Sequence, residues 1–204
     1  MPIFHARSTT NIGTNTHLFL HLGKAYGDEQ AESIKKEAAA EYDRMAGILG
    51  DAVKTNKMHA TFILERAALY KVLKEYYPDK AYKWIEKCIK KKNESRHESF
   101  AKMTSTKIGA AFFMKLCGIL TNTAFGEKAG FKVEWVRKDK EEVSFNMRAC
   151  PYCDYLSKLG VPELTKTFCD SDEYAYCGLD NVDFIRTMTL GTGGDKCDFI
   201  YRRS

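Results

Sequence analysis

The residues best suited to chemistry are thiols and carboxylates that crowd the C-terminal part of this 204-residue chain. Five of its seven cysteines lie in the last 55 residues. From Cys169 to Asp183 there are five acids and no Lys or Arg, so charge is not balanced locally. Groups in such surroundings have perturbed pKa values, which are typical of functional sites. We expect a site here, with Cys150, Cys153, Cys169, Cys177 and Cys197 as thiols and Asp170, Asp172, Glu173, Asp180 and Asp183 as acids.

The run Cys150-Pro-Tyr-Cys153 fits two chemistries. A CxxC at a helix start lowers the pKa of its first thiol and suits dithiol redox exchange, but a thioredoxin-like fold needs the motif after an early strand, not near the end of the chain. Metal binding is the alternative, with zinc or iron as the cofactor and no second C-x2-C to complete the pattern. Its ligands would be Cys150, Cys153, Cys169 and Cys197. A lone cysteine on an apolar helix face, such as Cys88 or Cys117, is more simply a small buried hydrophobe.

Three further motifs carry weaker signals. Gly191-Thr-Gly-Gly joins two strand-like runs and opens no helix, so a turn is favoured over a phosphate-binding loop. His59 lies on an expected helix from which it could reach the site, although a buried or surface histidine with no ligand is the simpler interpretation. The basic run 83–96 is interspersed with glutamates and reads as a solvated helix face.

In the first half of the chain, apolar residues recur at helical spacing. From residue 131 onward, apolar and polar residues alternate with a period of two, which is typical of strands. The residues at 165–183 read as a polar, acidic connection. We expect helices over 28–49, 56–76, from 78 onward, 105–121 and 151–159, and strands over 131–136, 142–147, 182–190 and 196–202. The helix at 105–121 is apolar nearly all round, which predicts a central, buried position.

These elements predict one α+β domain over 1–204. About four helices, in a mostly helical half at 28–125, would pack on an antiparallel sheet of about four strands. The sheet would belong to a Cys-rich half at 131–204.

Composition points to an ordinary globular protein, with 44% hydrophobic and 29% charged residues. The net charge of +5 is small and interspersed, which argues against a nucleic-acid partner. The N-terminus MPIFHARSTTNIGTN lacks the pattern of an export signal, so we expect a cytoplasmic protein. The most apolar stretch, 108–120, is too short to cross a bilayer, so no membrane partner is expected. Assembly of several copies into a homo-oligomer stays open.

Several motifs occur in order along the last 60 residues. They are Cys150, Phe168-Cys-Asp-Ser-Asp172, Phe184-Ile-Arg-Thr-Met-Thr-Leu190 and Gly193-Gly-Asp-Lys-Cys-Asp-Phe199. Together they resemble the L-2-amino-thiazoline-4-carboxylate hydrolase family, and the helical half fits that family through its length and helix content. Cys153 and Cys177 depart from the family pattern as additional thiols.

The resemblance implies a small-molecule substrate and a hydrolase acting on C–N bonds of cyclic amidines, such as the conversion of 2-amino-thiazoline-4-carboxylate to N-carbamoyl-cysteine. This chemistry needs a nucleophile, a proton donor and acceptor, and a cation for the substrate carboxylate. The candidates are Cys169 and Cys197 as nucleophiles, Asp172 and Asp198 as acid and base, Arg186 as the carboxylate clamp, and Thr187, Thr189 and His59 as further substrate contacts.

Strand geometry limits which of these residues can act together. On a strand, Arg186 and Met188 would share one face and Thr187 and Thr189 the other. Cys197 and Asp198 would likewise point to opposite faces. We therefore expect that Arg186 and the two threonines do not all line the same pocket. Of Cys197 and Asp198, we expect at most one to contact the substrate unless a bulge intervenes.

A second function class fits the same residues. Cysteines near a terminal β-hairpin are similar to those of small ligand-binding domains of the 4-vinyl-reductase type. Such a domain would be a non-catalytic sensor that holds a small molecule or metal and signals to a partner. The sequence shows no DNA-binding or signalling segment to carry that signal, which favours the enzyme.

Overall fold

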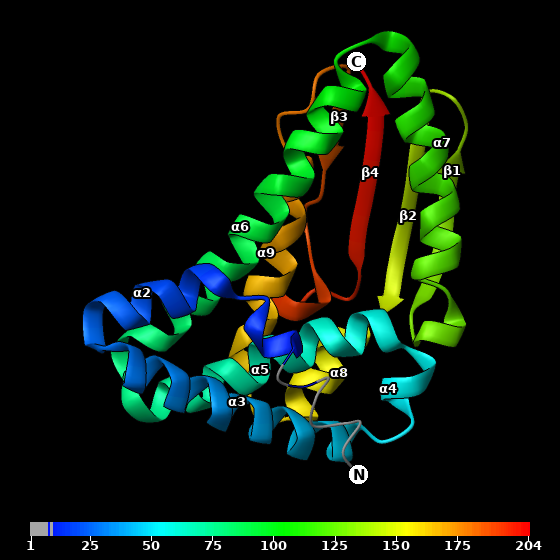
Figure 1. Ribbon diagram of the computed structural model, residues 1–204. Coiled ribbons are helices and arrows are strands. Elements are labelled where there is room, and N and C mark those ends of the chain that lie inside the picture. Colours follow the sequence, from blue (N-terminus) through cyan, green and yellow to red (C-terminus); the bar gives the residue numbers. More distant parts are fainter. Residues whose placement is uncertain (1–7, 9) are drawn as a thin grey trace. The chain divides into compact units, whose positions relative to one another are not determined.

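The computed structural model describes residue 8 and residues 10–204, and the chain forms two compact units. The first unit comprises the described residues up to Ile89 together with Tyr155–Leu164, and the second comprises Lys90–Asp154 and Thr165–Ser204. Two helices, α6 and α8, contribute residues to both units (Figure 1). Residues 1–7 and 9, part of the N-terminus assessed for an export signal, lie outside the described residues.

The first unit is built from helices whose positions largely match the sequence periodicity. The predicted helices at 28–49, at 56–76 and from Pro78 are confirmed, and Gly50 ends the first of them with a φ of 55°. Asp28 lies in the first turn, where its charge interacts favourably with the helix dipole, and Gly27 is the N-cap residue. The helices are α2 Thr16–Tyr26, α3 Asp28–Leu49, α4 Ala52–Thr55, α5 Lys57–Tyr76 and the first part of α6 Pro78–Thr104.

The second unit holds an antiparallel sheet with the strand order β1-β2-β4-β3. The expected α+β class and the four-stranded sheet are therefore confirmed. The strands are β1 Lys132–Lys138, β2 Glu142–Ala149, β3 Val182–Ile185 and β4 Cys197–Arg203. The other elements are the rest of α6, α7 Lys107–Ala124, the first half of α8 Pro151–Lys158 and α9 Thr165–Tyr176, with short 3-10 turns at Glu127–Ala129 and Leu190–Thr192. The second half of α8 and the 3-10 turn Pro162–Leu164 belong to the first unit.

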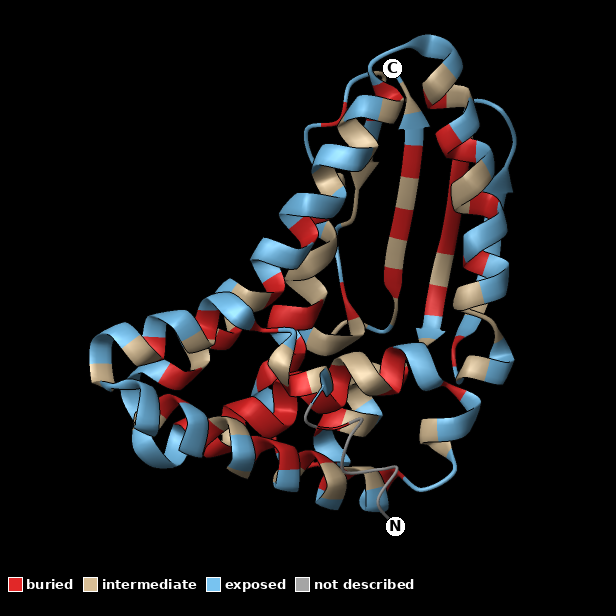
Figure 2. Cartoon of the chain, viewed as in Figure 1, coloured by how far each residue is buried: buried red, intermediate tan, exposed pale blue. Residues whose placement is uncertain are grey.

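Alternate residues of the two central strands form the core of this unit. Buried and less buried positions alternate along β4, as its banding in Figure 2 shows. Phe145 on β2 pairs with Phe199 on β4, and their rings stack with centroids 5.0 Å apart. Phe113 of α7 packs on the same apolar cluster, with its ring 6.2 Å from that of Tyr201. The sheet is thus anchored to α7 through aromatic side chains.

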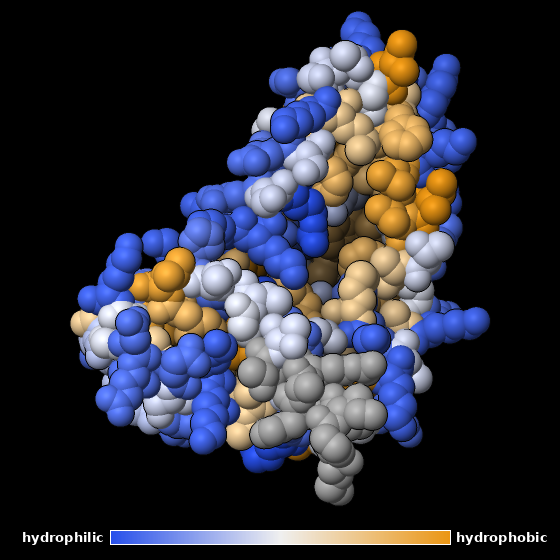
Figure 3. Space-filling view, viewed as in Figure 1, coloured by the Kyte–Doolittle hydropathy of each residue, from blue (hydrophilic) through white to orange (hydrophobic). Residues whose placement is uncertain are grey.

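The prediction that the 105–121 helix is buried on all sides is wrong. Phe113 and Met114 face the core, but Ile108, Phe112 and Ile119 are exposed. Apolar side chains gather over α7 in Figure 3. The helix covers one face of a sheet, so its other face has no neighbour in the described residues. Among those residues, no helix combines the length and apolarity that crossing a bilayer requires.

Two further expectations about local structure are wrong. The segment read as a polar connection contains α9, an amphipathic helix whose Phe168 and Ala175 are buried. The run 182–190 is a strand only as far as Ile185, after which the chain leaves the sheet. Both differences shape the site described below.

Replacing Phe113 by Ala is expected to lower the free energy of unfolding by about 3–5 kcal/mol, because it removes a large side chain from a closed core. Phe113 is 1% exposed and its neighbour Phe112 is 58% exposed. Phe112→Ala is therefore the matched control, with a change within about 0.5 kcal/mol. Urea denaturation followed by circular dichroism measures both. Equal losses in the two variants would contradict this packing.

Candidate functional site

The buried side chain of Arg186 forms the centre of the candidate site. Arg186 follows the last residue of β3, and its side chain is only 3% exposed. Its Nη1 donates to Asp172 Oδ2 at 2.8 Å and to the carbonyl oxygen of Cys169 at 3.0 Å. Its Nη2 donates to Glu173 Oε1 at 3.0 Å. A buried charge needs such partners, since an unpaired one is strongly destabilising.

All three acceptors come from α9, and helical spacing explains how one helix supplies them. Cys169, Asp172 and Glu173 stand at positions i, i+3 and i+4, which lie on one side of a helix. Phe184 and Phe199 complete the surroundings, with ring centroids 5.9 and 5.7 Å from the Arg186 guanidinium carbon. The guanidinium is therefore held between acidic groups of α9 and aromatic rings of the sheet.

Among the acids predicted for the site, Asp172 has the most strongly shifted pKa. Desolvation raises the pKa of its carboxyl to about 6, against the opposing charges of Arg186 and Arg96. This occurs although 32% of the side chain remains exposed. A carboxyl with a pKa near neutrality suits proton transfer at physiological pH.

The two predicted nucleophiles differ in access. Cys197 is buried in the core, and its sulfur accepts a hydrogen bond from the Leu190 N–H at 3.2 Å. Burial raises the pKa of Cys197 to about 11. Cys169 is half-buried, and burial also raises its pKa, while a hydrogen bond with Thr189 acts in the opposite direction. Cys169 is thus the more accessible thiol of the two.

Cys150 and Cys153 form a hydrogen-bonded thiol pair at the start of α8. The bond to Cys153, together with burial, raises the pKa of Cys150, and the same bond lowers the pKa of Cys153. The sequence predicted a lowered pKa for the first thiol, Cys150, but the thiol with the lowered pKa is the second, Cys153. Electrostatic interactions link Cys150 with Cys197 and Cys153 with Cys169. Within the described residues, however, no three His, Cys, Asp or Glu side chains have the arrangement of a metal site.

Gly191 allows the loop after β3 to lie directly against Cys169. A Cβ at this position would come 2.5 Å from the Cys169 sulfur and 2.7 Å from Thr165 Cγ2. The loop forms a 3-10 turn at Leu190–Thr192. The glycine expected to make a simple turn therefore also permits close packing on α9.

Asp198 holds the loop after β3 in place. It accepts hydrogen bonds from the Thr187 N–H at 2.9 Å, the Thr187 hydroxyl at 2.5 Å and the Met188 N–H at 2.8 Å. Burial alone would raise the pKa of Asp198, but these hydrogen bonds outweigh it and lower the pKa. The opposite orientation of Cys197 and Asp198 on β4 is confirmed, because Cys197 enters the core.

The expected alternation of side chains between two faces does not hold for the residues beyond β3. Arg186 and Thr189 were expected on opposite faces, yet both interact with Cys169. The reason is that the chain leaves the sheet after Ile185, so alternation no longer applies. Thr187 is engaged by Asp198, as described above.

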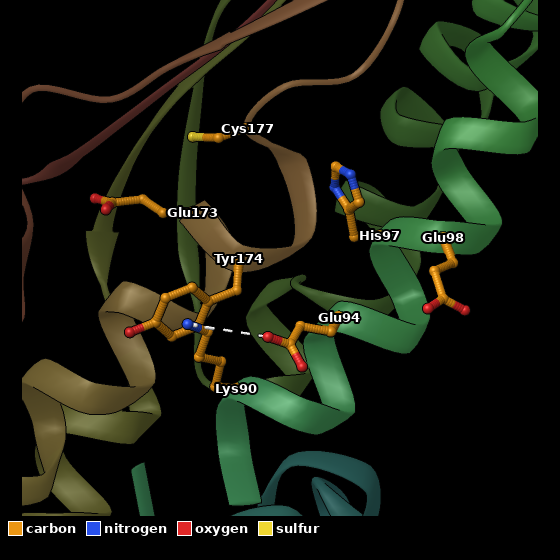
Figure 4. Close-up of a pocket in the computed structure, with 7 residues that line it drawn as sticks. All are labelled: Lys90, Glu94, His97, Glu98, Glu173, Tyr174 and Cys177. Carbon is orange, nitrogen blue, oxygen red and sulfur yellow. Dashed lines mark ion pairs between the residues drawn. The ribbon is translucent and has the colours of Figure 1, made fainter. Parts of the chain in front are cut away.

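A pocket adjoins the acidic side of Arg186 and contains residues that the sequence did not single out. Figure 4 shows its lining: Lys90, Glu94, His97, Glu98, Glu173, Tyr174 and Cys177. Nδ1 of His97 is buried and has no hydrogen-bond partner. Cys177 is exposed, and burial of its sulfur together with the charge of Glu173 raises its pKa. No sequence signal pointed to His97, because α6 ends about 60 residues before α9 begins in the chain.

His59 is the predicted site residue that lies in the first unit. It is buried on α5, as are Glu65 and Arg66, which form an ion pair. Its expected contact with a substrate stays a prediction.

Replacing Asp198 by Asn is expected to lower the free energy of unfolding by about 1–2 kcal/mol at pH 7, because charge-assisted hydrogen bonds to the loop are weakened. The lowered pKa of Asp198 means that its contribution is complete above the unfolded value of about 3.9 and disappears as pH falls through the folded value. The difference between the two proteins should therefore shrink in urea titrations below pH 3.

Asp195→Asn is the matched control, since Asp195 makes an exposed ion pair with Arg148 at 2.9 Å. It should change stability by less than about 1 kcal/mol at pH 7. A difference between wild type and Asp198→Asn that is constant from pH 7 to pH 2.5 would be inconsistent with a role for the Asp198 charge.

Comparison with known proteins gives one family and no individual relative. The model of a family described as L-2-amino-thiazoline-4-carboxylic acid hydrolase matches residues 54–201. Searches of curated proteins and of solved structures found no match.

Proposed function

The chain belongs to the L-2-amino-thiazoline-4-carboxylic acid hydrolase family, and on this premise we propose that it opens a small cyclic amidine carrying a carboxylate. The family name carries the reaction class, and the Asp172–Arg186 arrangement next to Cys169 supports it. The conversion of 2-amino-thiazoline-4-carboxylate to N-carbamoyl-cysteine consumes one water. Because that product keeps its C–N bonds, the ring bond that breaks is C–S, which refines the expected attack on a C–N bond.

Cys169 is the nucleophile in this proposal. Its sulfur attacks the ring carbon between N and S while Asp172 accepts the thiol proton. The ring C–S bond then breaks, and the departing sulfur takes that proton from Asp172. Water next attacks the carbon bound to Cys169, which restores the Cys169 thiol and releases the carbamoyl product.

A base is required because Cys169 is protonated at neutral pH. Burial raises the pKa of this thiol, so few molecules carry a thiolate before the substrate binds. Asp172 lies three residues further along α9, and its pKa of about 6 leaves it mostly ionised at pH 7. This perturbed carboxyl beside a half-buried thiol is the observation on which the proposal chiefly rests.

Cys169→Ala is expected to lower turnover of 2-amino-thiazoline-4-carboxylate by 100-fold or more, about the loss expected when a covalent step is removed. Mass spectrometry of N-carbamoyl-cysteine gives the rate. Cys88→Ala is the matched control, because Cys88 lies in the first unit, and it should retain full turnover. Full activity of Cys169→Ala would assign the attack to water.

If the wild-type protein binds thiazolines tightly but opens none of them, nor related rings such as hydantoins, the hydrolase proposal fails. The sensor function then replaces it.

The rate should also report the titration of Asp172. With a pKa of about 6 and a requirement for the ionised carboxylate, kcat/KM is expected to fall below pH 6. Asp172→Asn should lose this acid limb and show a residual rate lower by about 100-fold or more. Asp170→Asn is the control on the same helix, where Asp170 pairs with Lys166 at 2.6 Å, and it should keep the wild-type profile. An unchanged acid limb in Asp172→Asn would exclude Asp172 as the base.

A further inference from the structure

We propose that Glu173 is a displaceable internal ligand of Arg186, holding the position that the carboxylate of the substrate takes during the reaction. This inference rests on the proposed function and assigns Glu173 a role in substrate selection. The contacts of the guanidinium, the exposure of its partners and the adjoining pocket carry the argument.

The partners of Arg186 differ in how easily they can be exchanged. The Cys169 acceptor is a backbone carbonyl within α9, and it cannot leave without disturbing the helix. Asp172 has 32% of its side chain exposed and is the desolvated carboxyl of the site. Glu173 has 55% of its side chain exposed and contacts Nη2 alone, at 3.0 Å. Because more than half of the Glu173 side chain already contacts solvent, a departing Glu173 carboxylate regains its hydration with little rearrangement, so Glu173 is the partner most readily replaced.

Glu173 also stands between Arg186 and the pocket. It belongs to the pocket lining in Figure 4, and its carboxylate contacts the guanidinium. The Arg186 side chain is 3% exposed and is not part of that lining. An anion that arrives through the pocket therefore reaches Nη2 when Glu173 swings away. The neighbouring cation Lys90 is itself paired with Glu94 at 3.9 Å.

Charge balance makes this exchange selective. A substrate carboxylate that replaces Glu173 keeps Arg186 paired, and the released Glu173 gains full hydration. A neutral ring offers no such replacement, because displacing Glu173 would leave a buried guanidinium short of one anionic partner. The arrangement therefore favours ring carboxylates over neutral rings of the same size. It also places the ring next to Asp172, on the other nitrogen of the same guanidinium.

Binding of a ring that cannot be opened tests this inference separately from turnover. Thiazolidine-4-carboxylate has the ring and the carboxylate but no amidine, and thiazolidine lacks the carboxylate. By isothermal titration calorimetry, Glu173→Gln is expected to bind thiazolidine-4-carboxylate about fivefold more tightly than wild type, since the carboxylate that competes for Nη2 of Arg186 has been removed. Its affinity for thiazolidine should not change.

Asp170→Asn is the matched control, because it removes the same charge from the same helix without touching Arg186. It should bind the carboxylate as wild type does. Equal or weaker binding by Glu173→Gln, equal gains in both variants, or no binding by either protein would overturn the inference. A wild type that binds the carboxylate but opens no thiazoline, with the fivefold gain still present in Glu173→Gln, would refute the hydrolase and leave the exchange standing.

Discussion

A single buried cation, the guanidinium of Arg186, imposes the main constraint on the second unit. Removing a guanidinium from water costs several kcal/mol unless anions and hydrogen-bond acceptors replace the lost hydration. Here every hydrogen-bonding partner that the described residues provide comes from α9, while Arg186 itself continues from β3. The helix and the end of the sheet are therefore tied by charge as well as by packing. Asp172 and Glu173 of α9 have their cation, Arg186, in a segment of chain beyond the helix.

The fold was predictable where local pattern and tertiary role coincide. The hairpin of β1 and β2 and the helices α3 and α5 follow directly from periodicity and from Gly50 as a terminator. α9 was missed because its acids resemble a solvated connection, although Phe168 and Ala175 lie two helical turns apart on a buried side. α7 was misjudged for the opposite reason, since apolar composition does not reveal whether both faces of a helix have neighbours.

The sequence identified most residues of the site, but it did not reveal which contacts they make with one another. Cys169, Asp172, Arg186 and Thr189 were singled out from the sequence, and the structure brings them together. Their pairing depends on where β3 ends, and a strand boundary is set by tertiary contacts that a local pattern does not contain. The place of Asp198 beside the loop depends on the same boundary. Glu173 was among the acids expected at the site, but its contact with Arg186 follows only from the fold. His97 enters only through the fold, because a helix far away in the sequence supplies the other wall of the pocket.

The half-burial of Cys169 also affects how long the protein remains chemically intact. Peroxides oxidise the thiolate form of cysteine, first to a sulfenic acid and then irreversibly to higher acids. The raised pKa of Cys169 keeps the sulfur protonated at rest, so it reacts slowly with oxidants that reach it without a substrate. The same holds for Cys197, whose pKa is about 11. In the proposed mechanism, such a thiol gains durability under oxidative stress at the cost of a small thiolate fraction before the substrate binds.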